Sequence, residues 1–313
     1  VTAFASLAIY DAQTLSLTAD IAGSFTLEVL KGTLMAMDER LMAVRPHPDQ
    51  INTAANIRAI LKDSPMLERC RGHRVQDALS IRCMPQLHGP VKKAVKDAQA
   101  TLAIELNSSV DNPLIFDEED GGAVALMGCN ADGTYAGMAS DNLCIAITDL
   151  CKMSNSRIDR LLNSLVSELP AFLNKNADFN NGLMMIQYAS AGLQGELRIL
   201  AHPAVVDNLT TCANQEDYVN MGYNAAKKAY DSMHLAKYNI LAAELICDGQ
   251  ALDCYDDKRC AKGTQAIYDL LRSKVPEMDN DMPLTPYLEA VAQQIIDRAY
   301  IRTVEASVGA LKF

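Results

Sequence analysis

The chain has 313 residues, of which 49% are apolar and 21% charged, so it is long enough to fold and bury a hydrophobic core. Its 28 Lys and Arg residues against 39 Asp and Glu residues give a formal net charge of -11, and no local basic patch offsets it. This charge argues against nucleic acid or an anionic membrane as a partner.

Sequence patterns exclude several other classes of protein. Every long apolar run is broken before it reaches roughly 18 residues, so we expect no membrane span and a soluble protein. Nine cysteines, an odd number without a C-x-x-C pair, are typical of reduced thiols in a cytoplasmic protein. The five histidines form no H-E-x-x-H or Cys/His cluster, so we expect no metal site. Neither G-x-G-x-x-G nor a Walker loop occurs, which leaves nucleotide binding without support.

The chain opens on Val1 and continues directly into an apolar stretch, with neither an initiator Met nor a signal peptide. We therefore expect a processed or truncated product. Apolar residues at helical spacing follow, and each such stripe predicts an amphipathic helix whose stripe packs in the core. The four stripes are Leu27, Leu30 and Leu34; Leu143, Ile147, Leu150, Ser154, Ile158, Leu161 and Leu165; Ala229, Met233, Ala236, Ile240, Ala243 and Cys247; and Leu288, Val291, Ile295 and Ala299.

One region departs from helical spacing. Two short apolar runs, 114–116 and 123–126, flank an acidic turn that ends in two glycines, and this pattern predicts a small β-hairpin. Prolines mark the expected loops. The sequence contains no repeat, low-complexity tract or linker that would divide it. The predicted architecture is therefore all-α, a long antiparallel helix bundle with a small hairpin, over residues 1–313 as a single domain.

Polar residues without a packing period gather in two distant segments, 74–89 and 201–222, and two shorter ones, 105–113 and 181–187. Segment 105–113 reads Glu-Leu-Asn-Ser-Ser-Val-Asp-Asn-Pro, and segment 201–222 contains Asn-Gln-Glu-Asp-Tyr. In this order and spacing the segments resemble the aromatic amino acid ammonia-lyases, and histidine ammonia-lyase above all. The resemblance extends over nearly the whole chain.

The resemblance implies the central and C-terminal part of the ammonia-lyase or fumarase-like fold, in a cytoplasmic homotetramer whose active sites draw on more than one subunit. It implies elimination of ammonia from an amino acid to give an α,β-unsaturated acid. The family's electrophile, 4-methylideneimidazole-5-one, forms from an internal Ala-Ser-Gly, which this chain lacks. Residues 189–192, Ala-Ser-Ala-Gly, come nearest but read as a helical packing face. We therefore expect an N-terminal portion to supply the tripeptide.

Residue by residue, Arg82 matches the family's carboxylate-binding arginine, and a guanidinium suits that task because it binds a carboxylate with two parallel hydrogen bonds. Asn112 matches an amide near the same carboxylate. Gln76 matches an amide that lines the site. The alternatives are a pair between Arg82 and Asp77, an ordinary Asn-Pro turn at Asn112, and backbone hydrogen bonds for Gln76.

Gln215 matches an amide that supports the prosthetic group, and Glu216 matches the acidic position of histidine ammonia-lyases. A carboxylate there holds the substrate's nitrogen or transfers a proton, which makes Glu216 the expected catalytic residue. Its alternative is a helix-capping role. His88 and His202 are expected to hydrogen-bond turns instead of substrate.

Four positions depart from the family pattern. Leu79 stands where members usually carry Tyr, and Ala131 and Asp132 replace the Phe and His of an Asn-Phe-His sequence. Tyr218 replaces a His. A pocket with less aromatic lining and more negative charge predicts a polar or cationic amino acid as substrate. Two other readings remain open: an inactive helical scaffold or partner subunit, and an aminomutase that returns the amino group to the β-carbon.

Overall fold

Helix α1 (Thr2–Val29) runs through the bundle and is buried on every side from Thr14 to its end. Its sequence combines apolar residues with small hydroxyl residues and carries few charges, which suits a helix that other helices surround. The hydroxyls of Ser16, Thr18 and Ser24 donate to carbonyl oxygens four residues earlier, at 2.6 to 2.8 Å. These hydrogen bonds satisfy the polar groups that burial would otherwise leave unpaired.

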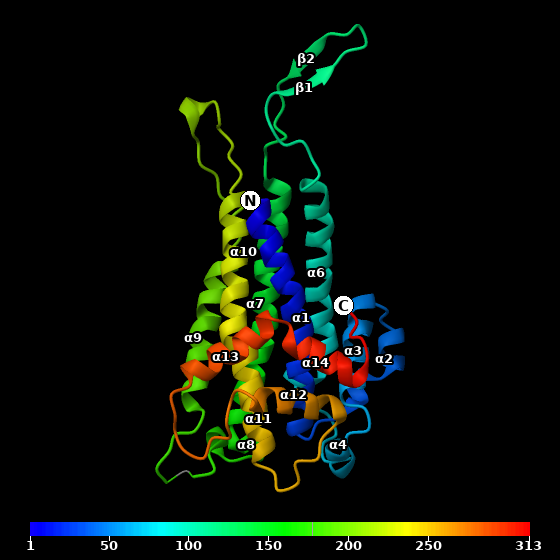
Figure 1. Cartoon of the computed structure of the whole chain (residues 1–313), viewed down its shortest axis with the longest axis vertical. Helices are drawn as coiled ribbons and strands as arrows, with labels where there is room; N and C mark the ends of the chain where they lie inside the picture. Colours follow the sequence, from blue (N-terminus) through cyan, green and yellow to red (C-terminus); the bar gives the residue numbers. More distant parts are fainter. Residues whose placement is uncertain (177) are drawn as a thin grey trace.

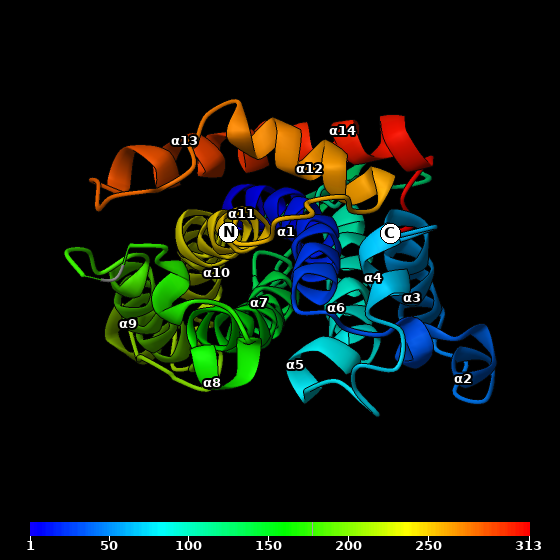
Figure 2. The same cartoon turned by 90° about the horizontal axis from the view of Figure 1, so that it is seen from below.

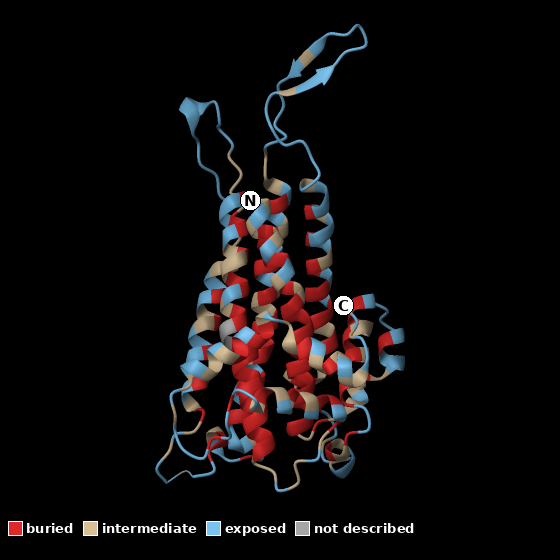
Figure 3. Ribbon diagram, viewed as in Figure 1, coloured by how far each residue is buried: buried red, intermediate tan, exposed pale blue. Residues whose placement is uncertain are grey.

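The computed structural model describes residues 1–176 and 178–313. Long helices lie side by side along its length (Figure 1). Beside α1 run α6 (Met84–Glu105), α7 (Thr134–Leu162), α9 (Met184–Leu200), and α10 (Gly222–Ala236) followed by α11 (Ala242–Asp253). Buried side chains concentrate where these helices face one another, and exposed ones lie outside and at the loops (Figure 3). The all-α bundle predicted from the sequence is therefore confirmed.

Shorter elements surround the bundle. On one side lie α2 (Glu39–Ala43), α3 (Pro48–Ile60), α4 (Pro65–Arg69) and the one-turn helix α5 (Leu79–Arg82). Helix α8 (Ser164–Ser167) follows α7, and 3-10 turns occur at Leu34–Met37, Ala171–Leu173 and Cys212–Asn214. Seen from below, α5 and α8 lie at the same end of the bundle (Figure 2).

The predicted hairpin is present as strands β1 (Leu114–Asp117) and β2 (Ala123–Leu126). The strands pair antiparallel, with Leu114 opposite Leu126 and Asp117 opposite Ala123. The hairpin projects from the end of the bundle that is opposite to α5, and the 201–221 segment projects beside it at the same end (Figure 1).

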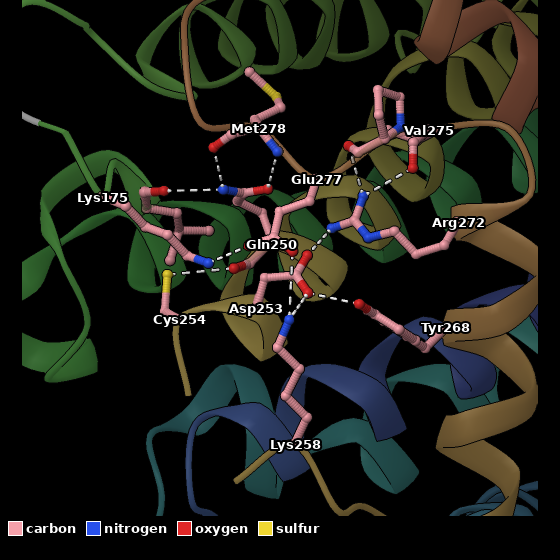
Figure 4. A network of polar contacts seen from close by, with 12 residues as sticks. Lys175, Gln250, Asp253, Cys254, Lys258, Tyr268, Arg272, Val275, Glu277 and Met278 are labelled. Atoms are coloured by element: carbon pink, nitrogen blue, oxygen red, sulfur yellow. Dashed lines mark hydrogen bonds and ion pairs between the residues drawn. The ribbon is translucent and has the colours of Figure 1, made fainter. Parts of the chain in front are cut away.

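The C-terminal helices α12 (Lys262–Arg272), α13 (Thr285–Ile296) and α14 (Ala299–Val308) cross one face of the bundle (Figure 2). A polar network fastens α12 and the segments before and after it to α11 (Figure 4). The Asp253 carboxylate pairs with Arg272, accepts from Lys258 at 2.7 Å and accepts from the Tyr268 hydroxyl at 2.6 Å. The Gln250 amide exchanges two hydrogen bonds with the backbone of Met278.

Three predicted helices end elsewhere than their apolar stripes suggest. Helix α7 stops at Leu162, so Leu165 lies beyond it and is 90% exposed. Helix α1 stops at Val29, before Leu34. The predicted 288–299 helix is two helices, because Arg298 adopts a left-handed conformation with φ of 56°. The 229–247 stripe is buried throughout, although a π-helical turn, Lys237–Leu241, interrupts it.

Within the described residues, none of the helices combines the length and apolar character that crossing a bilayer requires.

Candidate functional site

Arg82 is the last residue of α5, at the lower end of the bundle in Figure 1, and it is half-buried. Its Nη1 donates to Oε1 of Gln76 at 2.9 Å, so the structure brings together two of the predicted site residues. The alternative pair between Arg82 and Asp77 does not form, because Asp77 accepts from the backbone N–H of Thr33 at 2.8 Å. The Arg82 Nε is buried and has no hydrogen-bond partner within the described residues. The guanidinium therefore keeps donors for a carboxylate.

A fully buried ion pair in the bundle core fixes the backbone of α5. Arg157 on α7 forms a two-pronged pair with Glu244 on α11, and its Nη1 donates to the carbonyl oxygen of Ser80 at 3.2 Å. The Ser154 hydroxyl also donates to Glu244. Because both charges are fully buried, each needs the other, and the position of α5 depends on that core pair.

Asn112 lies at the base of the hairpin and is exposed. Its side-chain oxygen accepts from the backbone N–H of Gly128 at 3.0 Å, which ties together the two chain segments that lead into and out of the hairpin. This contact fits the structural alternative for Asn112, a turn residue, and uses the side-chain oxygen, whereas a substrate carboxylate would accept from the side-chain N–H groups.

Glu216 and Gln215 lie in the exposed 201–221 segment. The Thr211 hydroxyl donates to Oε2 of Glu216 at 2.5 Å, and the backbones of the same two residues form an isolated antiparallel bridge. Glu216 therefore closes a loop and does not cap a helix. The side chain faces solvent in this chain, so a buried environment for proton transfer must come from elsewhere.

The predicted site residues form two groups at opposite ends of the bundle. Arg82 and Gln76 precede α6, whereas Asn112 follows it, and Glu216 and Gln215 lie at the hairpin end (Figure 1). The 22 residues of α6 span about 33 Å. One copy of the chain therefore does not bring Arg82 and Glu216 around a single small molecule.

The structure gives Asp132 a structural role that the sequence did not predict. Its carboxylate accepts from the backbone N–H of Thr134 at 2.9 Å and from the Asn220 side chain at 3.0 Å. Burial raises the pKa of Asp132, but these hydrogen bonds outweigh burial and hold the pKa below its ordinary value. Asp132 thus connects the start of α7 to the 201–221 segment, and it stays negatively charged because its hydrogen-bond donors are neutral. The order Asp-Gly-Thr before a helix was the available signal for this role.

His88 also differs from its expected role in a turn. It lies inside α6, fully buried, with Nδ1 2.8 Å from the Asp20 carboxylate of α1. Lys92 donates to the other Asp20 oxygen at 2.6 Å. Burial lowers the pKa of His88 more than the Asp20 carboxylate raises it. His202 does lie in a turn, before Pro203.

A large open groove of about 1030 Å³ lies elsewhere on the molecule. It is lined by α3, α6, α7 and α9 side chains such as Leu87, Ile145 and Gln194, and none of the predicted site residues lines it. Within the described residues no cluster of His, Cys, Asp and Glu side chains has the geometry of a metal site.

The family's electrophile does not fit the residues of this chain. No Ala-Ser-Gly occurs in the 313 residues. The nearest sequence, 189–192, lies within helix α9 as expected, but of its four residues Ser190 alone is buried, so it is not a packing face. The Ser190 hydroxyl donates to Asn155 at 2.9 Å.

Comparisons with known proteins agree with the motifs. Histidine ammonia-lyase 2 of Fusobacterium nucleatum is 41% identical over 309 residues, which are 98% of this chain and 60% of that protein. The histidine ammonia-lyase of Alkaliphilus metalliredigens is 41% identical over 310 residues, 99% of this chain and 60% of that protein. The chain thus spans about 60% of the length of these relatives.

Solved structures share the fold. Histidine ammonia-lyase from Trypanosoma cruzi superposes with a TM-score of 0.89 at 32% identity, covering 98% of this chain and 57% of that one. Tyrosine aminomutase from Streptomyces globisporus gives a TM-score of 0.91 at 27% identity, with 99% and 62% covered. The family profile described as aromatic amino acid lyase matches residues 1–273. The chain therefore belongs to the aromatic amino acid lyase family.

Proposed function

We propose that the protein is an amino acid ammonia-lyase of the histidine ammonia-lyase type. The observation that carries this proposal is the match to histidine ammonia-lyases over 98% of the chain, with Arg82 and Glu216 present in the matching segments. In the reaction a proton leaves the β-carbon, and the electrons of the broken C–H bond form the Cα–Cβ double bond. The amino group departs as ammonia with the electrons of the C–N bond.

Arg82 has the chemistry to hold the substrate carboxylate. Its guanidinium is permanently charged. Gln76 accepts a hydrogen bond from Nη1 only, and the buried Nε has no partner within the described residues. Glu216 has the chemistry to hold the substrate's nitrogen or to transfer a proton once the site closes around it. The electrophile, 4-methylideneimidazole-5-one in this family, has to come from residues other than these 313.

We further propose that the site is assembled from more than one copy of the chain. Arg82 and Glu216 lie at opposite ends of a bundle whose α6 spans about 33 Å, whereas an amino acid is far shorter. Copies that pack antiparallel would bring the α5 end of one beside the hairpin end of another, which favours a homo-oligomer, a tetramer by resemblance. The nine free thiols agree with the predicted cytoplasmic location.

The substrate hypothesis keeps its support from charge. The donors that bond Asp132 are neutral N–H groups, so its carboxylate still adds negative charge beside the 201–221 segment. Two further positions support it. Leu79, which is 61% exposed, lacks the hydroxyl of the usual Tyr, and Ala131 lacks the aromatic ring of the usual Phe. We propose that an amino acid other than histidine is accepted.

A substrate screen tests both the proposed lyase activity and the proposed substrate range. The complete, assembled protein is incubated with each amino acid, and ammonia and products are measured. We expect ammonia together with an α,β-unsaturated acid, from at least one amino acid besides histidine. Reaction of histidine alone would contradict the substrate hypothesis, and no ammonia from any amino acid would contradict the lyase.

The same screen decides a second candidate. The likeness to a tyrosine aminomutase, at a TM-score of 0.91, favours an aminomutase as the alternative. A β-amino acid product without free ammonia would identify that activity. No product of either kind would favour an inactive scaffold or partner subunit.

A further inference from the structure

The 201–221 segment, which carries Gln215 and Glu216, is closed by its own hydrogen bonds. Beyond the bridge between Thr211 and Glu216, the Asn208 side chain donates to the carbonyl of Asp217 at 3.0 Å and accepts from the N–H of Val219 at 2.8 Å. Because the exposed end is internally bonded, the contacts at the base of the segment decide where Glu216 points.

Asp141 holds the first side of that base. It lies two turns into α7, and its side chain is 5% exposed. Its Oδ2 accepts from the backbone N–H groups of Ala204 and Val205, at 2.7 and 2.9 Å. Its Oδ1 lies 3.0 Å from Nζ of Lys228 on α10, and Lys228 also donates to the carbonyl of His202. One carboxylate thus joins two helices of the bundle to the start of the segment.

Asp132 and Asn220 hold the second side. Besides its bond to Asp132, the Asn220 side chain accepts from the N–H of Gly222, the first residue of α10, at 3.0 Å. The two sides differ in strength. Asp141 makes two charge-assisted hydrogen bonds to backbone and a nearly buried ion pair, whereas Asp132 contributes one hydrogen bond to the segment.

We propose that Asp141 is a positioning residue for Glu216, a role that rests on the proposed function. Asp141 does not contact Glu216, and it acts through the backbone of residues 204 and 205. Without its carboxylate those two N–H groups lose their acceptor, and the internally bonded segment can swing as a unit. The segment is mostly exposed and adds little to the core, so the expected effect is on catalysis more than on folding.

The test compares Asp141→Ala, Asp141→Asn and a control, Asp231→Ala, in the complete, assembled protein. Asp231 forms an exposed ion pair with Lys227 on α10, so the control removes a carboxylate that does not reach the segment. We expect Asp141→Ala to lower kcat by about 30-fold or more with KM changed by less than about threefold, since small displacements of a reacting group cost up to about 100-fold. Asp141→Asn keeps an oxygen for both N–H groups and should recover most of kcat.

Hydrogen exchange provides a second measurement that does not depend on activity. In Asp141→Ala, backbone amides of residues 204–219 should exchange faster, while those of α7 and α10 stay protected. Wild-type kcat in Asp141→Ala, equal losses in Ala and Asn variants, or faster exchange over the whole bundle would each overturn the proposal. If the wild-type protein releases no ammonia, the lyase proposal fails, and exchange alone decides whether Asp141 holds the segment.

Discussion

Two carboxylates in the bundle core, Glu244 and Asp248, contact the same hydroxyl and differ in their contact with Arg157. The Thr26 hydroxyl lies 2.8 Å from both Glu244 and Asp248, but Arg157 pairs with Glu244 alone. Asp248 Oδ2 has no partner within the described residues. Burial, followed by the Glu244 charge, raises the pKa of Asp248 well above its ordinary value. We infer that Asp248 keeps its proton to higher pH than an ordinary Asp, and Arg157 pairs with Glu244.

This assignment predicts that two amide substitutions change the free energy of unfolding by very different amounts. Glu244→Gln leaves Arg157 buried without a counter-charge and should lower the free energy of unfolding by about 3–5 kcal/mol. Asp248→Asn imitates a protonated carboxyl and should lie within about 1 kcal/mol of wild type near pH 4. Urea unfolding of both variants measures the difference.

The pH dependence has a definite sign. Because the folded pKa of Asp248 is raised, the unfolded chain loses this proton above about pH 4 while the folded protein keeps it, so the contribution of this group to wild-type stability falls as pH rises. Asp248→Asn lacks this pH-dependent contribution. Its free energy of unfolding relative to wild type should therefore rise by up to about 1.4 kcal/mol per pH unit until the folded pKa is reached. An Asp248→Asn variant that weakens relative to wild type as pH rises would show that the carboxyl is charged.

The sequence predicted candidate site residues but not the contacts that hold them. Arg82 and Gln76 were expected in one site, and they are hydrogen-bonded. By contrast, Asp141 binds backbone more than 60 residues away, and the partner of His88 lies 68 residues away on α1. Helical spacing reports which face of a helix is buried and carries no information on which distant side chain meets it there.

At the scale of elements, the helices were predictable in kind and less so in extent. Stripes of apolar residues indicated α7 and the α10–α11 pair because burial imposes the helical period. The break at Arg298 could not be read from the sequence, since neither Pro nor Gly marks it and the apolar spacing continues across it.

The close packing of α7 against α10 leads to a prediction at this scale. A Cβ at Gly137 would lie 2.9 Å from the Cα of Gly222 and 2.9 Å from Val205 Cγ1, so these helices touch backbone to backbone. Gly137→Ala should lower the free energy of unfolding by about 1–3 kcal/mol, because the helices have to separate. Urea or thermal unfolding gives the value.

Gly192 is the matched control, since it lies in helix α9 and a methyl group added to its Cα would have nothing within 4 Å. Gly192→Ala should raise stability by about 0.5–1 kcal/mol through helix propensity alone. Equal stability of the two variants would show that α7 and α10 are not in close contact.

At the scale of the molecule, most buried apolar residues, from α1 through to α14, form one connected cluster. This continuity agrees with a single folding unit over residues 1–313, which stays a prediction. The candidate site shows the opposite arrangement, because its residues are divided between the two ends of the bundle (Figure 1). In our proposal the long helical bundle places each half of the site beside a neighbouring copy.

Mixing two inactive variants tests this account most directly. Arg82→Ala and Glu216→Ala, each in the complete protein and with a different tag, are co-assembled, and mixed oligomers are isolated through both tags. If Arg82 and Glu216 of one site come from different copies, random mixing leaves both intact in about a quarter of the sites, one half times one half. Ammonia release near a quarter of the wild-type rate is the predicted result. Mixed oligomers no more active than either parent would contradict a site shared between copies.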